Sequence, residues 1–176
     1  MNLVLIGYRC SGKTEVGKNL ARELSTDFLD TDAVIEQRAG CTIDHIIAGN
    51  GWEAFRAMER ELIKELSEKD HLIIATGGGA VMDEVNVSRL KRNGWLIWLK
   101  GSEEALKKRM TADHQSVSMR PSLTGMDTLE EIRHVLAQRI PYYRKAGNCE
   151  IDTTHLSVKE VVRSILSMIP SGSWGQ

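Results

Sequence analysis

Charge of either sign is not in excess in this sequence of 176 residues. The 23 lysines and arginines against 24 aspartates and glutamates leave a net charge of −1 at pH 7. Nucleic acids and anionic membranes attract proteins through a basic excess, so we expect neither as a partner. Any anion that the protein binds must instead meet a local cluster of basic side chains. The near-neutral charge, with no evident apolar stripe on the expected surface, favours a monomer.

Cysteine and long apolar runs are also scarce. Cys10, Cys41 and Cys149 are odd in number and widely spaced, which is typical of reduced thiols in a cytosolic protein rather than of a disulfide framework. The apolar run at residues 2–6 is too short to span a membrane and lacks the flanks of a signal peptide. No histidine stands at metal-ligand spacing from another histidine or a cysteine, so we expect no structural zinc. We expect a cytoplasmic protein.

Strand-like and helix-like patterns alternate along the chain. Short apolar runs predict strands at residues 2–6, 28–30, 71–75, 95–99 and 150–152. Helical patterns lie at 13–25, 43–47, 52–66, 102–110 and 128–147, and a last helix opens at Ser157 and closes at Pro170. The alternation predicts an α/β fold, a parallel sheet covered by helices on both faces, with ligands beyond the carboxyl ends of the strands. The 41% hydrophobic content favours one domain over residues 1–170, followed by a loose tail at 171–176.

A glycine loop follows the first expected strand directly. Its sequence, GYRCSGKT, matches the GxxxxGK[ST] pattern of phosphate-binding loops without deviation, although a plain glycine turn between strand and helix would share the pattern. Glycines let successive N–H groups turn toward phosphate oxygens, Lys13 can reach the β- and γ-phosphates, and the Thr14 hydroxyl can ligate Mg²⁺. The expected contacts to the nucleotide come from Gly7, Arg9, Cys10, Ser11, Gly12, Lys13 and Thr14.

Two carboxylates follow the short second strand. Asp30 and Asp32 stand two residues apart in an extended segment, so their side chains point to the same side. Near a triphosphate, one can hold Mg²⁺ through water and the other can accept a proton from a substrate hydroxyl. The same residues also fit a helix start, with Thr31 or Asp32 capping residues 33–38, and the two roles are compatible.

The expected helix at 52–66 carries both apolar and charged signals. Its apolar residues on one face are Phe55, Met58, Leu62 and Leu66. Arg56 and Glu59 share a face, so Glu59 can orient Arg56 toward a carboxylate, although a surface ion pair has the same spacing. Trp52, one turn before Arg56, fits either a pocket wall or core packing. The glycines at 77–79, after the next strand, allow backbone N–H groups to approach a ligand closely.

The choice among phosphate-loop proteins narrows by elimination. The DxxG and NKxD motifs of GTPases are absent, and the chain is too short for a large ATPase domain, which leaves the small-molecule and nucleoside monophosphate kinases. Within that group the chain resembles shikimate kinases over nearly its whole length. The resemblance is carried by an ordered set of motifs: GxxxxGKT at 7–14, DTD at 30–32, FRxxE at 55–59, GGGA at 77–80, RP at 120–121 and RxPxY at 139–143.

The resemblance implies a fold and a reaction. The fold has three layers, α/β/α, with five parallel strands in the order 2-3-1-4-5 and a mobile lid at about residues 111–127. The reaction transfers the γ-phosphate of ATP, with Mg²⁺, to the 3-hydroxyl of shikimate, giving shikimate 3-phosphate for chorismate and aromatic amino acid biosynthesis. Asp32 would be the catalytic base, assisted by Lys13 and by Arg120 from the lid.

The resemblance also implies the binding residues. Asp32, Arg56, Gly78, Gly79 and Arg139 would bind shikimate. Arg109 and Arg120 would join the glycine loop in binding the nucleotide, Arg109 by stacking on adenine unless it is simply a solvated arginine. Thr14 and Asp30 would hold Mg²⁺.

Two rival functions stay open. A kinase for gluconate or a nucleoside monophosphate would use the same loop, but it would not need two arginines converging on one carboxylate. A non-catalytic ATP-binding module would be expected to have lost Asp32 or Arg120, and both are present.

Overall fold

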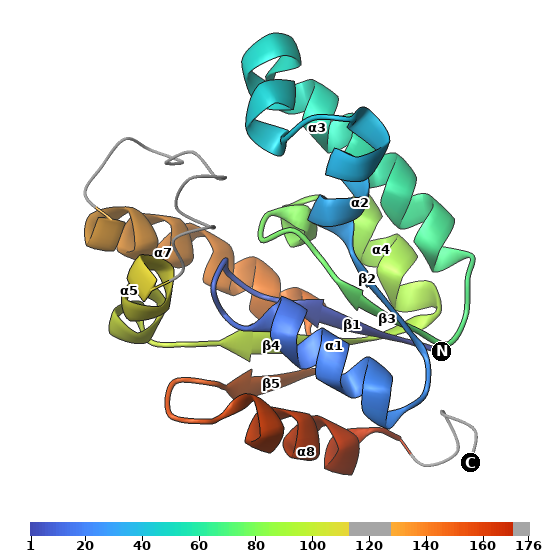
Figure 1. The fold of residues 1–176 in the computed structure, drawn as a ribbon, viewed down its shortest axis with the longest axis vertical. Helices are drawn as coiled ribbons and strands as arrows, with labels where there is room; N and C mark the ends of the chain where they lie inside the picture. The colour runs from blue at the N-terminus through green and yellow to red at the C-terminus, as the bar shows by residue number, and fades with distance from the viewer. Residues whose placement is uncertain (113–127, 171–176) are drawn as a thin grey trace.

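A computed structural model describes residues 1–112 and 128–170, which form a parallel sheet between two layers of helices (Figure 1). The strands are β1 (Asn2–Ile6), β2 (Asp27–Asp30), β3 (Leu72–Ala75), β4 (Gly94–Lys100) and β5 (Cys149–Asp152). Neighbouring strands all pair in parallel, in the order β2-β3-β1-β4-β5. The expected strand order and three-layer arrangement are confirmed.

The helices occupy the connections between the strands. They are α1 (Lys13–Glu23), α2 (Thr31–Ala39), α3 (Ile43–Ser67), the 3₁₀ turn η1 (Ala80–Met82), α4 (Glu84–Arg92), α5 (Glu103–Ala112), α7 (Thr128–Ala146) and α8 (Val158–Met168). The sequence pattern did not predict α4, because only Asn86 and Leu90 of this mostly polar helix are buried. The predicted capping box of α8 is present, with Ser157 and Glu160 each bonded to the backbone of the other.

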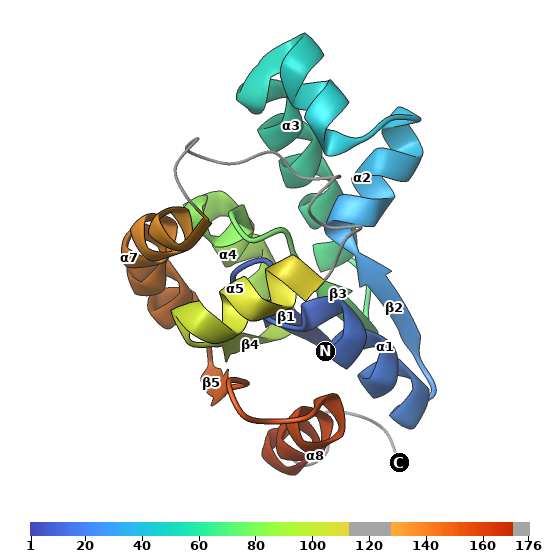
Figure 2. The same cartoon turned by 60° about the vertical axis from the view of Figure 1, so that its left-hand side comes forward.

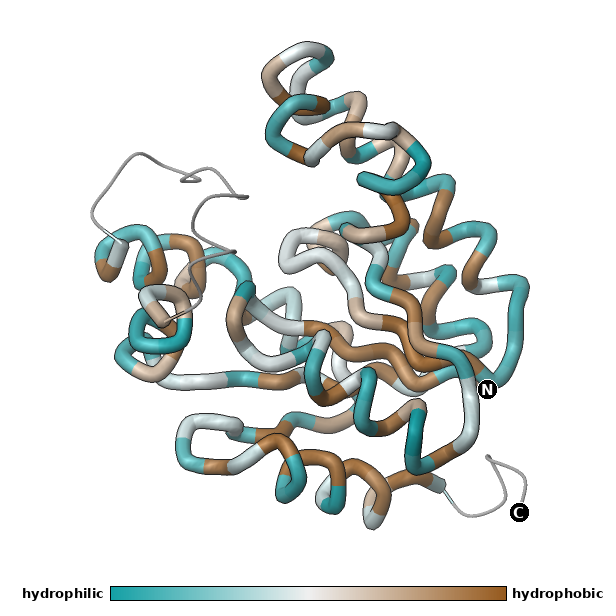
Figure 3. The backbone as a smooth tube through the Cα atoms, in the orientation of Figure 1, coloured by the Kyte–Doolittle hydropathy of each residue, from teal (hydrophilic) through white to brown (hydrophobic). Residues whose placement is uncertain are grey.

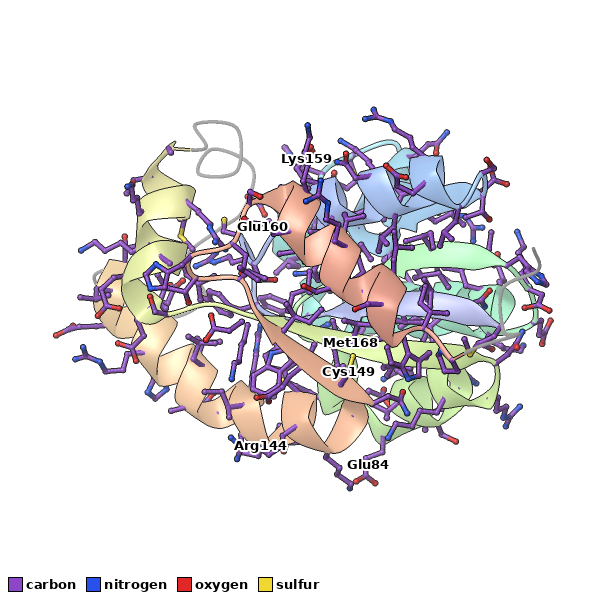
Figure 4. The ribbon with its side chains drawn as sticks, turned by 90° about the horizontal axis from the view of Figure 1, so that it is seen from below. Glu84, Arg144, Cys149, Lys159, Glu160 and Met168 are labelled. Atoms are coloured by element: carbon purple, nitrogen blue, oxygen red, sulfur yellow. The ribbon has the colours of Figure 1, made fainter. Side chains whose placement is uncertain are left out.

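The central strands are buried on both faces because each face of the sheet meets its own helical layer. Leu3 and Leu5 of β1 belong to a core shared with α1 and α8, whereas Val4 and Ile6 belong to a core shared with α2, α3, α4 and α7. The apolar strands run through the middle of the molecule and polar positions lie on the outside (Figure 3). Seen from below, α8 lies across the sheet, with Lys159 and Glu160 at its start and Met168 near its end (Figure 4).

The buried face of α3 differs from the expected one. Phe55, Leu62 and Leu66 are buried as predicted, but Met58 is 42% exposed. The position between Phe55 and Leu62 on the buried face belongs instead to Glu59, whose exposed fraction is zero. Met58 was placed on the buried face because periodicity arguments assign buried positions to apolar side chains. The correction places a carboxylate inside the helix layer.

The sequence predicts a break between the helical segments 43–47 and 52–66, and in the structure this break is a single residue wide. Gly51 interrupts α3 with φ 80° and ψ 170°, a backbone conformation that side chains rarely adopt. The break separates the first turns of α3 from the segment that carries Arg56. It therefore lets the two parts of α3 run in different directions over the sheet.

α5 and α7 pack together beyond the carboxyl end of β4, through an apolar cluster that includes Leu106 and Ile132 (Figure 2). α5 runs to Ala112, so the first residues of the expected lid are helical. Residues 113–127, with Arg120, lie outside the described residues, as does the tail at 171–176, so the lid and the domain limits stay predictions. Within residues 1–112 and 128–170, each helix is too short or too polar to cross a membrane.

Candidate active site

The phosphate-binding loop connects β1 to α1, and its glycines are required by geometry. Gly7 has φ 143°, and a Cβ there would overlap the carbonyl oxygen of Leu99 on the neighbouring strand. Gly12 precedes α1 with φ 97°, and no side chain among the described residues caps that helix. The first-turn N–H groups of α1 are therefore left for an anion, which is what a phosphate site at a helix start requires.

Lys13 is the buried cation of this loop. Only 9% of its surface is exposed, and its Nζ donates hydrogen bonds of 2.8 Å to the carbonyl oxygens of Gly7 and Tyr8. The ammonium thus lies inside the curl of the loop, bonded to its backbone. A bound phosphate can replace these carbonyls as the acceptor of the Lys13 ammonium, because the ammonium is a compact charge on a flexible stem and can turn toward the phosphate.

Asp30 links the nucleotide side of the site to the acceptor side. Its Oδ2 accepts a hydrogen bond of 2.8 Å from the Thr14 hydroxyl, and its Oδ1 accepts the backbone N–H groups of Asp32 and Ala33. Asp30 is therefore the N-cap of α2, whereas the sequence placed the cap on Thr31 or Asp32. The shift arises because β2 runs straight into α2, so the last strand residue is also the cap.

Thr14 and Asp30 are the two residues predicted to hold Mg²⁺, and their oxygens are the hard donors that this cation prefers. The described part of the chain has no cluster of three or more His, Cys, Asp or Glu side chains able to hold a metal alone. Mg²⁺ typically binds one or two protein oxygens together with substrate phosphates, and the pair fits that arrangement.

A cavity lies next to the loop, between α2, α3, the glycines at 77–79 and α7. Its charged lining residues are Arg9, Asp32, Asp44, Arg56, Glu59 and Arg139. One wall is apolar and consists of Ile43, Ile47, Trp52 and Phe55. The lining thus holds three arginines and three carboxylates, of which Glu59 is paired with Arg56. Charged groups of both signs beside apolar side chains suit a small, polar molecule that carries both an acidic group and hydroxyls better than a flat nucleobase.

Trp52 belongs to this wall and not to the core. It is 43% exposed, its ring lies 5.6 Å from the Arg56 guanidinium carbon, and it meets Phe55 edge-on at 6.1 Å. Of the two interpretations of Trp52, the pocket wall is the one that the structure supports.

Arg56 is held by the buried Glu59. Their atoms Nη1 and Oε2 are 2.6 Å apart, and Arg56 is 26% exposed whereas Glu59 is fully buried. Burial raises the pKa of Glu59, and the attraction of Arg56 opposes that rise. The predicted pair is thus no surface ion pair: it fixes one edge of the guanidinium and leaves the other available to a ligand.

The glycines at 77–79 leave room for charged side chains. A Cβ at Gly77 would lie 2.6 Å from Oδ1 of Asp32, one at Gly78 would lie 3.3 Å from Nη1 of Arg139, and one at Gly79 would overlap Arg56. The loop backbone therefore lies directly against the carboxylate and both arginines. Any residue larger than glycine would push one of these groups away.

Arg9 has a contact that the loop motif does not predict. Its backbone belongs to the phosphate-binding loop, but its guanidinium lines the cavity and pairs with Glu131 of α7, which is 2% exposed. Arg109, predicted to stack on adenine unless it is a solvated arginine, donates to Thr153 just after β5, with Nη1 2.9 Å from the hydroxyl oxygen. This contact places Arg109 beside the glycine loop, because Thr153 also bonds the carbonyl of Ser11.

The sequence predicted most of the residues that meet here and missed several. Asp32, Arg56, Gly78, Gly79 and Arg139 line one cavity beside Lys13, Thr14 and Asp30; Arg120 lies outside the described residues. Asp44, Glu131, Tyr143 and Thr153 were not assigned. Tyr143 carried a signal as the last residue of the RxPxY motif, and Glu131 fitted a capping box with Thr128 at the start of the helix. Asp44 and Thr153 have no local pattern that separates them from surface polar residues.

Comparison with known proteins agrees with this geometry. The sequence model of the shikimate kinase family matches residues 9–170. A shikimate kinase from Syntrophus aciditrophicus is 42% identical, covering 97% of this chain and 91% of the relative, and one from Symbiobacterium thermophilum is 41% identical, covering 96% of each. Among solved structures, the shikimate kinase from Acinetobacter baumannii in complex with shikimate superimposes with a TM-score of 0.88 at 33% identity, covering 96% of this chain and 92% of that one. The chain belongs to the shikimate kinase family.

Proposed function

We propose that this protein transfers the γ-phosphate of ATP to the 3-hydroxyl of shikimate, and that it serves chorismate and aromatic amino acid biosynthesis. One observation carries the proposal. Asp32, Arg56, Arg139 and the glycine backbone at 77–79 line one cavity, and Gly78 lies next to the backbone of Gly7 and Arg9 in the phosphate-binding loop. A hydroxylated ring acid fits this polarity, with its carboxylate at the arginines and its hydroxyls at Asp32.

The carboxylate supplies most of the orientation of the acceptor. A small polyol acid offers little apolar area, so charge-assisted bonds must position it. Arg56 presents a fixed edge because Glu59 holds the other, and Arg139 approaches from α7. Lysine would replace either arginine poorly, since it lacks the planar fork that meets both carboxylate oxygens.

Asp32 accepts the proton of the 3-hydroxyl as that oxygen attacks the γ-phosphorus. The new oxygen–phosphorus bond forms as the bond to the β–γ bridging oxygen breaks, ADP leaves, and the proton stays on the Asp32 carboxyl until solvent removes it. Asp32 lies at the first turn of α2, whose cap Asp30 fixes its position. General-base catalysis of this kind contributes roughly 10²- to 10⁴-fold in rate.

The nucleotide binds at the glycine loop, with the first turn of α1 at its phosphates and Lys13 as their cation. Mg²⁺, when bound, neutralises the β- and γ-oxygens, and Thr14 and Asp30 are the residues that would hold it. Arg120 acts on the transferring phosphoryl group from a lid at about 111–127. The protein acts as a cytoplasmic monomer, as its near-neutral charge and reduced thiols favour.

An ADP-release assay with MgATP tests the proposal, with shikimate, quinate, gluconate, AMP and no acceptor compared side by side. Turnover with shikimate well above every other acceptor is the expected result. Turnover with gluconate or AMP alone would keep the kinase and remove the roles given to Arg56 and Arg139. ATP binding without turnover on any acceptor would leave a non-catalytic ATP-binding module.

A further inference from the structure

Tyr143 is a fully buried side chain of α7 with a polar atom directed at the glycine loop. Its exposed fraction is zero, its ring stacks on Trp98 at 5.7 Å, and its hydroxyl donates a hydrogen bond of 2.6 Å to the carbonyl oxygen of Gly78. Burial raises its pKa to about 12, so the hydroxyl stays protonated and remains a donor at any physiological pH. The mechanism above gives this residue no role.

The carbonyl of Gly78 and the N–H of Gly79 belong to one peptide unit. The structure contains no cis peptide bond within its described residues, so this unit is trans and planar and its N–H points opposite to its C=O. A hydrogen bond that fixes the Gly78 carbonyl on the Tyr143 side therefore fixes the direction of the Gly79 N–H as well. Glycine pairs are otherwise free to rotate such a unit, because they lack a Cβ.

The two glycine N–H groups are donors in need of an acceptor. Within residues 1–112 and 128–170, the N–H groups of Gly78 and Gly79 have no hydrogen-bond partner, whereas the N–H of Gly77 donates to Thr31 Oγ1 at 3.0 Å. Gly79 is buried, and a buried N–H without a partner is rare in a folded protein. The same peptide lies between the guanidinium groups of Arg56 and Arg139 and lines the cavity, which Tyr143 does not.

We infer that Tyr143 is a positioning residue that aims the Gly79 N–H at the acceptor carboxylate and so contributes to the recognition of ring acids. This inference rests on the proposed function, because it assigns a third donor to the carboxylate site of Arg56 and Arg139. Arg139 lies one helical turn before Tyr143 on the same face of α7. One helix therefore supplies both a direct cation and the group that orients the backbone donor.

The test compares Tyr143→Phe with Tyr142→Phe. The first removes only the hydroxyl, and the second makes the same change at the adjacent tyrosine, which is 40% exposed and has no hydrogen bond to the glycines at 77–79 among the described residues. Tyr143→Phe removes the bond to the Gly78 carbonyl and also a hydrogen bond between the hydroxyl and the Arg139 side chain. Loss of the neutral bond alone corresponds to about a two- to tenfold effect, so we expect the KM for shikimate to rise by at least that factor in Tyr143→Phe, with the KM for ATP unchanged. Tyr142→Phe should behave as wild type.

A neutral acceptor shows whether Tyr143→Phe specifically weakens binding of the carboxylate or loosens the whole acceptor cavity. Methyl shikimate keeps the hydroxyls and lacks the anionic carboxylate, so the ratio of kcat/KM for shikimate to that for the ester should fall in Tyr143→Phe. A parallel loss on both acceptors, or a parallel rise in both KM values, would overturn the inference and leave Tyr143 as packing. Absence of shikimate turnover in the wild type would instead remove the proposed function, and the inference with it.

An NMR titration of the unmodified protein guards against instability of the variant. The backbone amide proton of Gly79 should shift downfield on addition of shikimate and much less on addition of methyl shikimate, because a charged acceptor forms the stronger hydrogen bond. Equal shifts with both compounds, or none with shikimate, would contradict the assignment of this N–H as a carboxylate donor.

Discussion

The nucleotide side and the acceptor side of this active site are built in opposite ways. The proposed nucleotide side is centred on one continuous segment, residues 7–14, whose backbone groups and Lys13 are assigned to the phosphates. The proposed acceptor side brings together side chains from α2, α3 and α7 with the backbone of the glycines at 77–79, and these segments lie up to about a hundred residues apart in sequence. Binding any triphosphate needs only a local backbone shape, whereas selecting one acceptor needs several directed charges.

The largest effect should come from the acceptor side, through Asp32→Asn. Asparagine keeps the size of the side chain and cannot take the hydroxyl proton, so kcat should fall about 10²- to 10⁴-fold. ATP binding, measured by calorimetry, should be retained. Asp27→Asn, the same change at an exposed position of β2, is the control. A variant that keeps wild-type kcat would show that another group removes the proton.

On the nucleotide side, Lys13→Met should lower kcat about 10²- to 10³-fold, because the ammonium that meets developing charge on the phosphates is lost. The KM for shikimate should change little. Lys18→Met, on the exposed face of the same helix, serves as the control. A shift in the shikimate KM as large as the loss in kcat would mean that the two sides are not separate.

Binding of the acceptor carboxylate should weaken in Arg139→Lys. The charge is kept but the planar fork is lost, so the KM for shikimate should rise about tenfold with little change in the KM for ATP. Arg144→Lys makes the same change on an exposed part of α7 (Figure 4) and should be silent. If both arginine variants behave alike, Arg139 does not bind the acceptor.

The smallest effect concerns stability and its pH dependence, through Glu59→Gln. Because the folded-state pKa of Glu59 is raised, its contribution to stability is fully present below the ordinary glutamate pKa and is lost as the pH rises through the folded value. The variant lacks this titration. The melting temperature of the variant minus that of the wild type should therefore increase between pH 4 and neutrality, by on the order of a few degrees, because only the wild type loses stability through this group.

Thermal unfolding across that pH range measures the difference. Glu61→Gln, on the exposed side of α3, is the control: its melting temperature relative to wild type should not increase between pH 4 and neutrality. A constant offset for Glu59→Gln at every pH would mean that Glu59 titrates as an ordinary carboxylate.

The difference between a local segment and a site assembled from distant elements also determines what a sequence can predict. The strands and the loop at 7–14 were predictable, because apolar runs and glycine spacing are local signals, whereas the strand order came only from the family resemblance. Glu59 was predicted to orient Arg56 but its burial was not predicted, and Met58 was mistaken for a core residue, since a carboxylate paired inside a helix layer breaks the apolar periodicity. The contact of Arg9 with Glu131 had no signal at all, because it depends on how α7 packs against the loop. The convergence of Arg56 and Arg139 was expected only through family resemblance.

The cap of α2 carries a lesson for anyone who wishes to redesign such a kinase. The two carboxylate oxygens of Asp30 serve different partners, one holding the Thr14 hydroxyl and the other the start of the helix that bears Asp32. An acceptor pocket that is transplanted onto another phosphate-loop scaffold must therefore include Asp30, because without this cap the position of Asp32, the proposed base, is no longer fixed. Conversely, because Asp30 is also the cap of α2, a change at Asp30 made to alter the proposed cation site will also disturb the start of the helix that bears Asp32, the proposed base.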